Sequence, residues 1–148
     1  MKQILVGIDG SESSFGAAAH AALLAATMGA ELHAVTVIHP SDYELDEVRG
    51  YLMPKDRYID LSAFFEREVA ARLSRCSEIA AAAGVGRLHQ TSRVGLDIAH
   101  ELLDYARRNA IDLIVVGSRG RGRLPGLLLG SVSQKLASVA HCSVLIAR

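Results

Sequence analysis

The sequence holds 148 residues, enough for one domain with its own hydrophobic core. Half of the residues are hydrophobic and 22% are charged, an ordinary mixture for a soluble globular protein. The 16 basic and 16 acidic residues cancel, so net charge gives no reason to expect a nucleic acid or an anionic membrane as a partner.

No targeting or membrane segment is predicted. The apolar run at residues 4–8 is too short for a signal peptide and stops at Asp9. The uncharged stretch 13–30 consists mostly of small residues and is too weakly apolar to favour a bilayer. Cys76 and Cys142 lie far apart without metal or redox spacing, which favours two buried free thiols over a disulfide. We therefore expect a cytoplasmic protein.

The hydrophobic period changes repeatedly between a strand pattern and a helix pattern. Residues 4–8 are an apolar run that predicts a buried strand. Residues 11–28 begin with Ser and Glu, are rich in Ala and Leu, and are followed by Gly29, which together predict a helix. Residues 32–38 predict a second strand. Residues 39–56 show no clean period and predict a loop, which at this length is often functional.

A long helix is predicted from about residue 57 to residue 83, before Gly84. Its apolar stripe is Leu61, Phe65, Val69, Leu73, Cys76, Ala80 and Ala83. Its predicted solvated face holds Glu66, Arg67, Arg72 and Glu78. Beyond it we predict a weaker strand near a sheet edge at 87–94, a helix after Gly95, a strand at 111–116, a helix at 131–140 and a last strand at 143–147.

The helix after Gly95 is predicted to place Leu96, Ala99, Leu102, Leu103 and Ala106 on one apolar face. In all, five strands alternate with four helices, which is typical of right-handed βαβ crossovers and of a parallel sheet covered on both faces. No domain boundary or repeat appears. The sequence therefore predicts a single α/β domain, doubly wound, over residues 1–148.

Parallel sheets of this kind bind ligands beyond the carboxyl ends of their strands. Two polar segments fall at such ends, 9–11 after the first strand and 117–131 after the fourth. Glycines in the second segment let backbone N–H groups approach an anion, and the helix start at Gly130 and Ser131 adds donors and a positive dipole end. The local positive potential is raised by Arg119, Arg121 and Arg123. We predict a phosphate site here, the alternative being a solvated loop without a ligand.

Two common phosphate motifs do not fit this segment. No GxxxxGK[ST] is present, because Ser131 follows Gly130 and precedes Val132 without a lysine. The run from Gly120 reaches Gly126 one residue too late for GxGxxG, and it follows the fourth strand rather than the first. A P-loop and a dinucleotide fingerprint are therefore disfavoured.

The spacing Gly117-x2-Gly120-x9-Gly130-Ser131 resembles the nucleotide signature of the universal stress protein family. Residues 4–11, 115–120 and 129–133 resemble that family's first strand and turn, fourth strand and last helix, so the resemblance covers essentially the whole chain. It implies an adenine-nucleotide-binding, Rossmann-like α/β fold with five parallel strands in the order 3-2-1-4-5.

The resemblance also implies a ligand, ATP, and a set of residues that bind it. These are Asp9, Val37, Gly117, Gly120, Gly130 and Ser131, to which Arg119 is added for its positive charge. The glycines and the serine are expected to hold the ribose and the phosphates. Asp9 is expected to touch ribose hydroxyls or a bound divalent ion, Mg²⁺ or Mn²⁺. Val37 is expected to pack on adenine, although an ordinary core position explains it equally well.

In this family the last strand commonly pairs with its copy in a second subunit, which implies a homodimer through residues 143–147. This segment is apolar enough for such pairing. The chain departs from the family at Cys142-Ser143, where Cys-Pro is common. That change weakens a local turn preference and leaves the nucleotide signature intact.

Other candidate residues are given structural roles. The histidines, none in metal spacing and each expected at the surface or partly buried, are His20, His33, His39, His89, His100 and His141. His39 is treated separately as a possible pocket residue, because it follows Val37 and is expected near the proposed ligand face. Ser11 is interpreted as the cap of the first helix rather than as a nucleophile paired with Asp9.

The sequence thus favours an ATP-binding stress-response module that acts through a conformational or partner-binding change. No residue offers an obvious general base, so at most slow ATP hydrolysis is expected. One alternative is an adenine-nucleotide hydrolase, but residues 9–14 lack the SGGxDS loop of that group. The other is a stress protein that does not bind ATP, against which the glycine signature argues.

Overall fold

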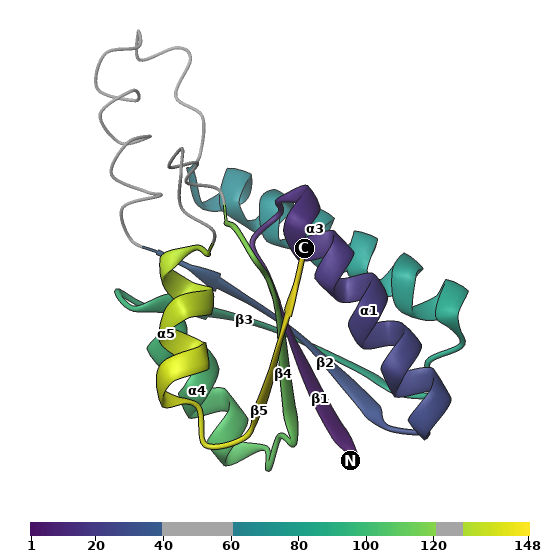
Figure 1. Cartoon of the computed structure of the whole chain (residues 1–148). Helices are drawn as coiled ribbons and strands as arrows, with labels where there is room; N and C mark the ends of the chain where they lie inside the picture. Colours follow the sequence, from purple (N-terminus) through teal and green to yellow (C-terminus); the bar gives the residue numbers. More distant parts are fainter. Residues whose placement is uncertain (40–60, 121–128) are drawn as a thin grey trace, which may run out of the picture.

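The computed structural model describes residues 1–39, 61–120 and 129–148. Its strands are β1 (Gln3–Ile8), β2 (Glu31–Ile38), β3 (Leu88–Val94), β4 (Leu113–Gly117) and β5 (Ser143–Ala147). Its helices, labelled as in Figure 1, are α1 (Glu12–Met28), α3 (Leu61–Ala83), α4 (Ile98–Arg108) and α5 (Ser131–Val139). Apart from His39, the loop predicted at 39–56 lies outside the described residues, as do Arg121 and Arg123.

The five strands form one parallel sheet in the order β3-β2-β1-β4-β5, with helices on both of its faces (Figure 1). β1 pairs with β2 on one side and with β4 on the other. Ile4, Leu5 and Val6 of β1 are fully buried, because strands flank β1 and helices cover both faces. The predicted fold class and strand order are confirmed.

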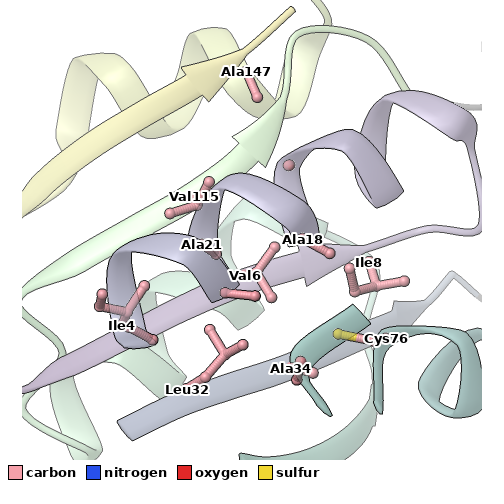
Figure 2. Close-up of a cluster of buried hydrophobic side chains, with 14 of the residues drawn as sticks. Ile4, Val6, Ile8, Ala18, Ala21, Leu32, Ala34, Cys76, Val115 and Ala147 are labelled. Carbon is pink, nitrogen blue, oxygen red and sulfur yellow. The ribbon is translucent and has the colours of Figure 1, made fainter. Parts of the chain in front are cut away.

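α1 and α3 cover one face of the sheet. α1 meets the sheet through alanines that are completely buried, namely Ala17, Ala18, Ala21, Ala22 and Ala25. Figure 2 shows Ala18 and Ala21 beside the branched side chains of Ile4, Val6 and Ile8. Small side chains on the helix let its backbone approach the sheet closely, and the larger side chains of β1 fill the space between them.

α4 and α5 cover the other face. The buried residues there include Leu5, Val35, Ile114, Val116, Ala99, Leu102, Leu103, Ala106 and Leu136. Leu96, predicted to be part of the apolar helix face, is instead 78% exposed. The reason is that Asp97 caps α4 by accepting a hydrogen bond from the His100 N–H at 3.1 Å, so Leu96 precedes the helix.

The predicted boundaries of α1 and α3 are confirmed where the structure describes them. Ser11 caps α1, its hydroxyl accepting a hydrogen bond from the Ser14 N–H at 3.1 Å. α1 ends at Gly29, and Gly84 follows α3; both glycines have positive φ, 62° and 80°. These angles cost glycine nothing and let the chain leave each helix toward the next strand.

β3 is an edge strand, as predicted. It pairs with β2, and its residues are half-buried or exposed. Arg93 ties it to α4 through Glu101 and Asp104, each at 2.9 Å. Within the described part of the chain these ion pairs add polar contacts to an otherwise weakly buried strand.

The cysteines are both free thiols, Cys76 buried and Cys142 half-buried. Burial raises the pKa of Cys76 to about 11, so this thiol stays protonated and behaves as a small apolar side chain. Over residues 1–39, 61–120 and 129–148, no helix is long and apolar enough to cross a membrane.

The alanine face of α1 generates a stability prediction. Ala21→Leu adds three carbon atoms where the side chain is 0% exposed, so it should lower the free energy of unfolding by about 1–3 kcal/mol. Ala19→Leu places the same atoms on the exposed face of the same helix and should change it by less than about 0.5 kcal/mol. Urea denaturation of both variants measures the difference, and equal losses would contradict close packing at Ala21.

Candidate functional site

The carboxyl ends of β1, β2 and β4 open into a pocket of about 420 Å³. Open parallel sheets bind ligands where the strand order reverses, which in this sheet is between β1 and β4. The pocket lining includes Asp9, Val37, Gly117, Arg119, Gly120, Gly130 and Ser131. All seven predicted ligand residues are therefore together in the structure, while their contact with a ligand stays a prediction.

Asp9 follows β1 directly, and its carboxylate is held at one side. Oδ1 accepts hydrogen bonds from the Ser11 N–H at 2.9 Å and from the Ser11 hydroxyl at 2.6 Å. Oδ2 faces Gly120, since a Cβ placed on Gly120 would lie only 2.9 Å from it. Glycine at position 120 therefore leaves room for the second carboxylate oxygen at the pocket.

Gly117 ends β4 where the first turn of α1 comes closest. A Cβ on Gly117 would lie 2.4 Å from the Ser13 Oγ and 2.8 Å from the Ser13 carbonyl carbon. Atoms at those distances overlap, so glycine alone fits this position without displacing backbone. The Arg119 N–H also points at Ser13, donating to its hydroxyl at 3.5 Å.

α5 presents its N-terminus to the pocket. Its N-cap, Gly130, has no side chain to accept the first-turn N–H groups, and Ser131 and Val132 line the pocket beside it. The Gly130 N–H donates to the Ser118 carbonyl at 2.7 Å, and the Ser133 hydroxyl donates to the Gly130 carbonyl at 2.9 Å. The N-terminus is thus fixed in place with its positive dipole end at the pocket, an arrangement that suits an anion.

The pocket also has an apolar wall. Val37 of β2 is 7% exposed and lines it together with Val35 and Val116 of the sheet and Leu102 of α4. Apolar side chains beside a carboxylate, guanidinium groups and a helix N-terminus are the mixture expected of a site for a small organic anion.

Arg72 of α3 lies on the inward face of its helix, so its predicted position on a solvated face is wrong. It is 9% exposed and lines the pocket. It lies against Gly10, whose φ is 87° and whose added Cβ would lie 3.0 Å from the Arg72 Nε. The signal was present, because position 72 is three residues after Val69 and four before Cys76, on the helix face that packs inward. Because arginine is charged, this position is predicted to lie on the solvated face despite its spacing from the apolar residues.

His39 lines the same pocket, at the end of the first described range. The sequence predicts that this histidine lies near the proposed ligand face. With Asp9, Arg72 and Arg119 it brings four ionisable side chains to the pocket from four different segments. Apart from His39, the described lining carries two cationic side chains, Arg72 and Arg119, and one carboxylate, Asp9.

This architecture matches a known protein family. A model of the universal stress protein family matches residues 1–148. A universal stress protein of Bacillus subtilis is 35% identical over 147 residues, covering 99% of this chain and 98% of the relative. One from Methanocaldococcus jannaschii is 31% identical over 147 residues, covering 99% of this chain and 82% of the relative.

Solved structures agree. The universal stress protein UspA from Lactobacillus plantarum superposes with a TM-score of 0.73 at 26% identity, covering 99% of this chain and 97% of that one. A universal stress protein solved in complex with cAMP gives 0.71 at 28% identity, covering 99% and 96%. Fold and pocket define a doubly wound α/β protein with a pocket at the reversal of strand order. The chain belongs to the universal stress protein family.

The pocket glycines differ in the space available for an added Cβ, so replacing them by alanine should affect stability to different degrees. Gly117→Ala should lower the free energy of unfolding by about 1–3 kcal/mol, because its Cβ overlaps Ser13. Gly130→Ala should cost at most about 1 kcal/mol, since its Cβ meets nothing nearer than 3.5 Å and only the N-cap preference is lost. Guanidinium denaturation compares the two, and a Gly117→Ala protein as stable as the wild type would refute the close approach.

Proposed function

We propose that the pocket binds an adenine nucleotide, with ATP as its ligand, and that the protein acts as a nucleotide-dependent stress-response module in the cytoplasm. The observation that carries the proposal is the convergence of Gly117, Gly120, Gly130 and Ser131 with Asp9 in one pocket. The relative solved with cAMP supports an adenine nucleotide as the ligand class.

The chemistry of the lining suggests how ATP would lie. Its phosphates would take the N-terminus of α5, where Gly130 leaves N–H donors without a side-chain cap, with the Ser131 hydroxyl beside them. Arg119 would add positive charge at the same end. The adenine ring would lie on the apolar wall at Val37. The ribose would meet Asp9, whose Oδ2 is the oxygen that Ser11 does not occupy.

A divalent ion, Mg²⁺ or Mn²⁺, fits this site as a companion of the phosphates. Asp9 supplies a carboxylate, the donor that such hard cations prefer, and it is the one carboxylate among the described lining residues. The ion would neutralise phosphate charge. We expect at most slow hydrolysis, because one oxygen of that carboxylate already accepts two hydrogen bonds from Ser11 and the other would face the ribose or the ion.

A homodimer through β5 is part of the proposal. β5 pairs with β4 on one side and ends the strand order on the other. Val144, Leu145 and Ile146 in it are only half-buried in the single chain. Pairing with a second copy would cover these side chains and satisfy the backbone groups of the open edge.

Nucleotide binding is tested by releasing small molecules from the purified protein and identifying them by mass spectrometry, followed by calorimetric titration with ATP. We expect copurified ATP or ADP, and at least a tenfold loss of ATP affinity in Gly130→Val, which is about 1.4 kcal/mol of binding free energy. The cause is a branched side chain placed at the phosphate end of the pocket.

The matched control is Gly86→Val, an exposed glycine with nothing within 4 Å of an added Cβ, which should bind ATP like the wild type. Protein that is free of nucleotide and shows no ATP binding at millimolar concentration would end the proposal. A turnover assay with Mg²⁺ or Mn²⁺ then separates a binding module from an adenine-nucleotide hydrolase, and fast release of phosphate would favour the hydrolase.

The dimer is tested by light scattering coupled to size-exclusion chromatography. The wild type is expected at twice the chain mass, and Ile146→Glu should shift it to one chain mass, because a charge would be buried at the paired edge. Leu23→Glu, on α1 with Leu23 62% exposed, should remain dimeric. A wild type that elutes at a single chain mass at high concentration would contradict this arrangement.

A further inference from the structure

A second group of ligating side chains lies at the opposite end of the sheet from the pocket. Glu31 is the first residue of β2, and His33 follows two residues later on the same face. His89 of β3 is the register partner of His33 across the parallel pair. One ligand atom of each residue lies within 4.8 Å of those of the other two.

We propose that Glu31, His33 and His89 form a binding site for a divalent transition metal, with Zn²⁺ as the ion tested first. Two imidazoles and one carboxylate are the donor set that zinc uses in sites with an open fourth position. The same set suits neighbouring ions of the first transition row, whereas calcium and magnesium prefer oxygen ligands alone.

The two rings are close together but must turn to share an ion, because each nitrogen lone pair lies in its ring plane and the planes of stacked rings do not converge on one point. The imidazoles of His33 and His89 stack with centroids 4.4 Å apart and planes inclined by 22°. The His89 Nε2 lies 2.7 Å from the Glu31 Oε2. In tetrahedral zinc, with bonds of about 2.0–2.1 Å, the ligand atoms lie roughly 3.3 Å apart. The His89–Glu31 pair must therefore open slightly, whereas the other two pairs already lie within 4.8 Å.

The side chains that have to move have room to do so. His33 is 5% exposed and is fixed, whereas the side chains of Glu31 and His89 are 31% and 41% exposed. Partly exposed side chains change rotamer without disturbing the core. The buried histidine therefore provides a fixed ligand, and the two outer residues adjust to the ion.

Neighbouring groups orient His33 as supporting groups do in metal sites. The Tyr105 hydroxyl lies 2.9 Å from the Nδ1, and the Gln3 Oε1 lies 2.7 Å from the Nε2. Because the Gln3 Oε1 can only accept, the Nε2–H donates to it in this structure and the Nδ1 accepts from the Tyr105 hydroxyl. An ion at the Nε2 requires the other tautomer, in which the Nδ1–H donates to Tyr105 and the Nε2 carries the lone pair. Gln3 then either gives way to the ion or offers its carbonyl oxygen as a fourth ligand. Burial lowers the pKa of His33, which keeps the ring neutral and able to coordinate.

The carboxylate has a resident cation that a metal would replace. The Arg87 Nη1 lies 3.0 Å from the Glu31 Oε1, and the Arg87 side chain is 68% exposed. The pKa of Glu31 is lowered, first through its hydrogen bond with His89 and less through Arg87, so the group is ionised and ready to bind a cation. Arg87 has free space into which it can withdraw.

This site is distinct from the ATP pocket. His33 and Val37 are four residues apart on β2, roughly 13 Å along a strand. A metal here cannot contact phosphates that are bound at α5. It would instead join β2 to the edge strand β3 and so stabilise the folded chain against unfolding.

Calorimetric titration of the tag-free, chelator-dialysed full chain with Zn²⁺ tests the proposal. We expect one ion per chain, micromolar or tighter affinity, and a rise in the thermal unfolding midpoint. His89→Gln and Glu31→Gln should each weaken binding at least about tenfold, because each removes a ligand while leaving the buried His33 in place. His20→Gln, at an exposed histidine of α1, should bind Zn²⁺ like the wild type.

Two further variants separate this site from its surroundings. Gly130→Val should keep full Zn²⁺ affinity whether or not ATP binding is lost, so the two proposals fail independently. Arg87→Ala should bind Zn²⁺ at least as tightly as the wild type, because the competing cation is gone. Co²⁺ should give the visible absorption bands of a tetrahedral site, absent in His89→Gln. Zn²⁺ affinity that is unchanged in His89→Gln, or no saturable binding in the wild type, would overturn the proposal.

Discussion

The close approach between the end of β4 and the first turn of α1 is the constraint on which both the core and the pocket depend. At Gly117 the Ser13 backbone occupies the place where a side chain would begin. The buried alanines continue this proximity along α1, so the helix lies on the sheet with only the side chains of the strands between them. Because α1 starts so close to β4, Asp9 and Gly120 can lie next to each other at the edge of the pocket.

In a parallel sheet the amino ends of all strands lie at one edge and their carboxyl ends lie at the opposite edge. Residues distant in sequence therefore meet at two ends with different chemistry. Here Asp9, Val37 and Gly117 converge at the carboxyl ends. His33 and His89, which are opposite each other in the register of β2 and β3, converge toward the amino ends. β2 is the strand common to both, with Val37 in the pocket and Glu31 and His33 in the histidine–carboxylate cluster.

Much of this architecture was predictable because it follows from local patterns. Hydrophobic period, Ser11 as a cap and Gly29 as a terminator define α1 from the sequence alone, and alternation of strands and helices implies the parallel sheet. Spaced glycines and the strand ends where they fall led to the pocket. The resemblance, rather than the pattern, supplied the strand order and the identity of the proposed ligand.

The parts that escaped prediction depend on pairings that no local pattern encodes. Leu96 fits a helical apolar stripe, but Asp97 starts the helix one residue too late to include it. Arg72 is charged, so its inward position on α3 was not recognised. His33 and His89 are 56 residues apart, as their neighbours Glu31 and Arg87 are, and only the register of β2 with β3 brings them together. Spacing rules for metal sites assume ligands on one segment or motif, which is why they found nothing here.

The two short hydrogen bonds of Ser118 have a consequence for how the last helix and the last strand are held against β4. Its carbonyl accepts from the Gly130 N–H, and its N–H donates to the Ala147 carbonyl, each at 2.7 Å. The segment from Gly117 to Gly120 is thereby hydrogen-bonded directly to Gly130 and to β5. Because both bonds use backbone atoms of residue 118, the register between these segments does not depend on which side chain stands at that position.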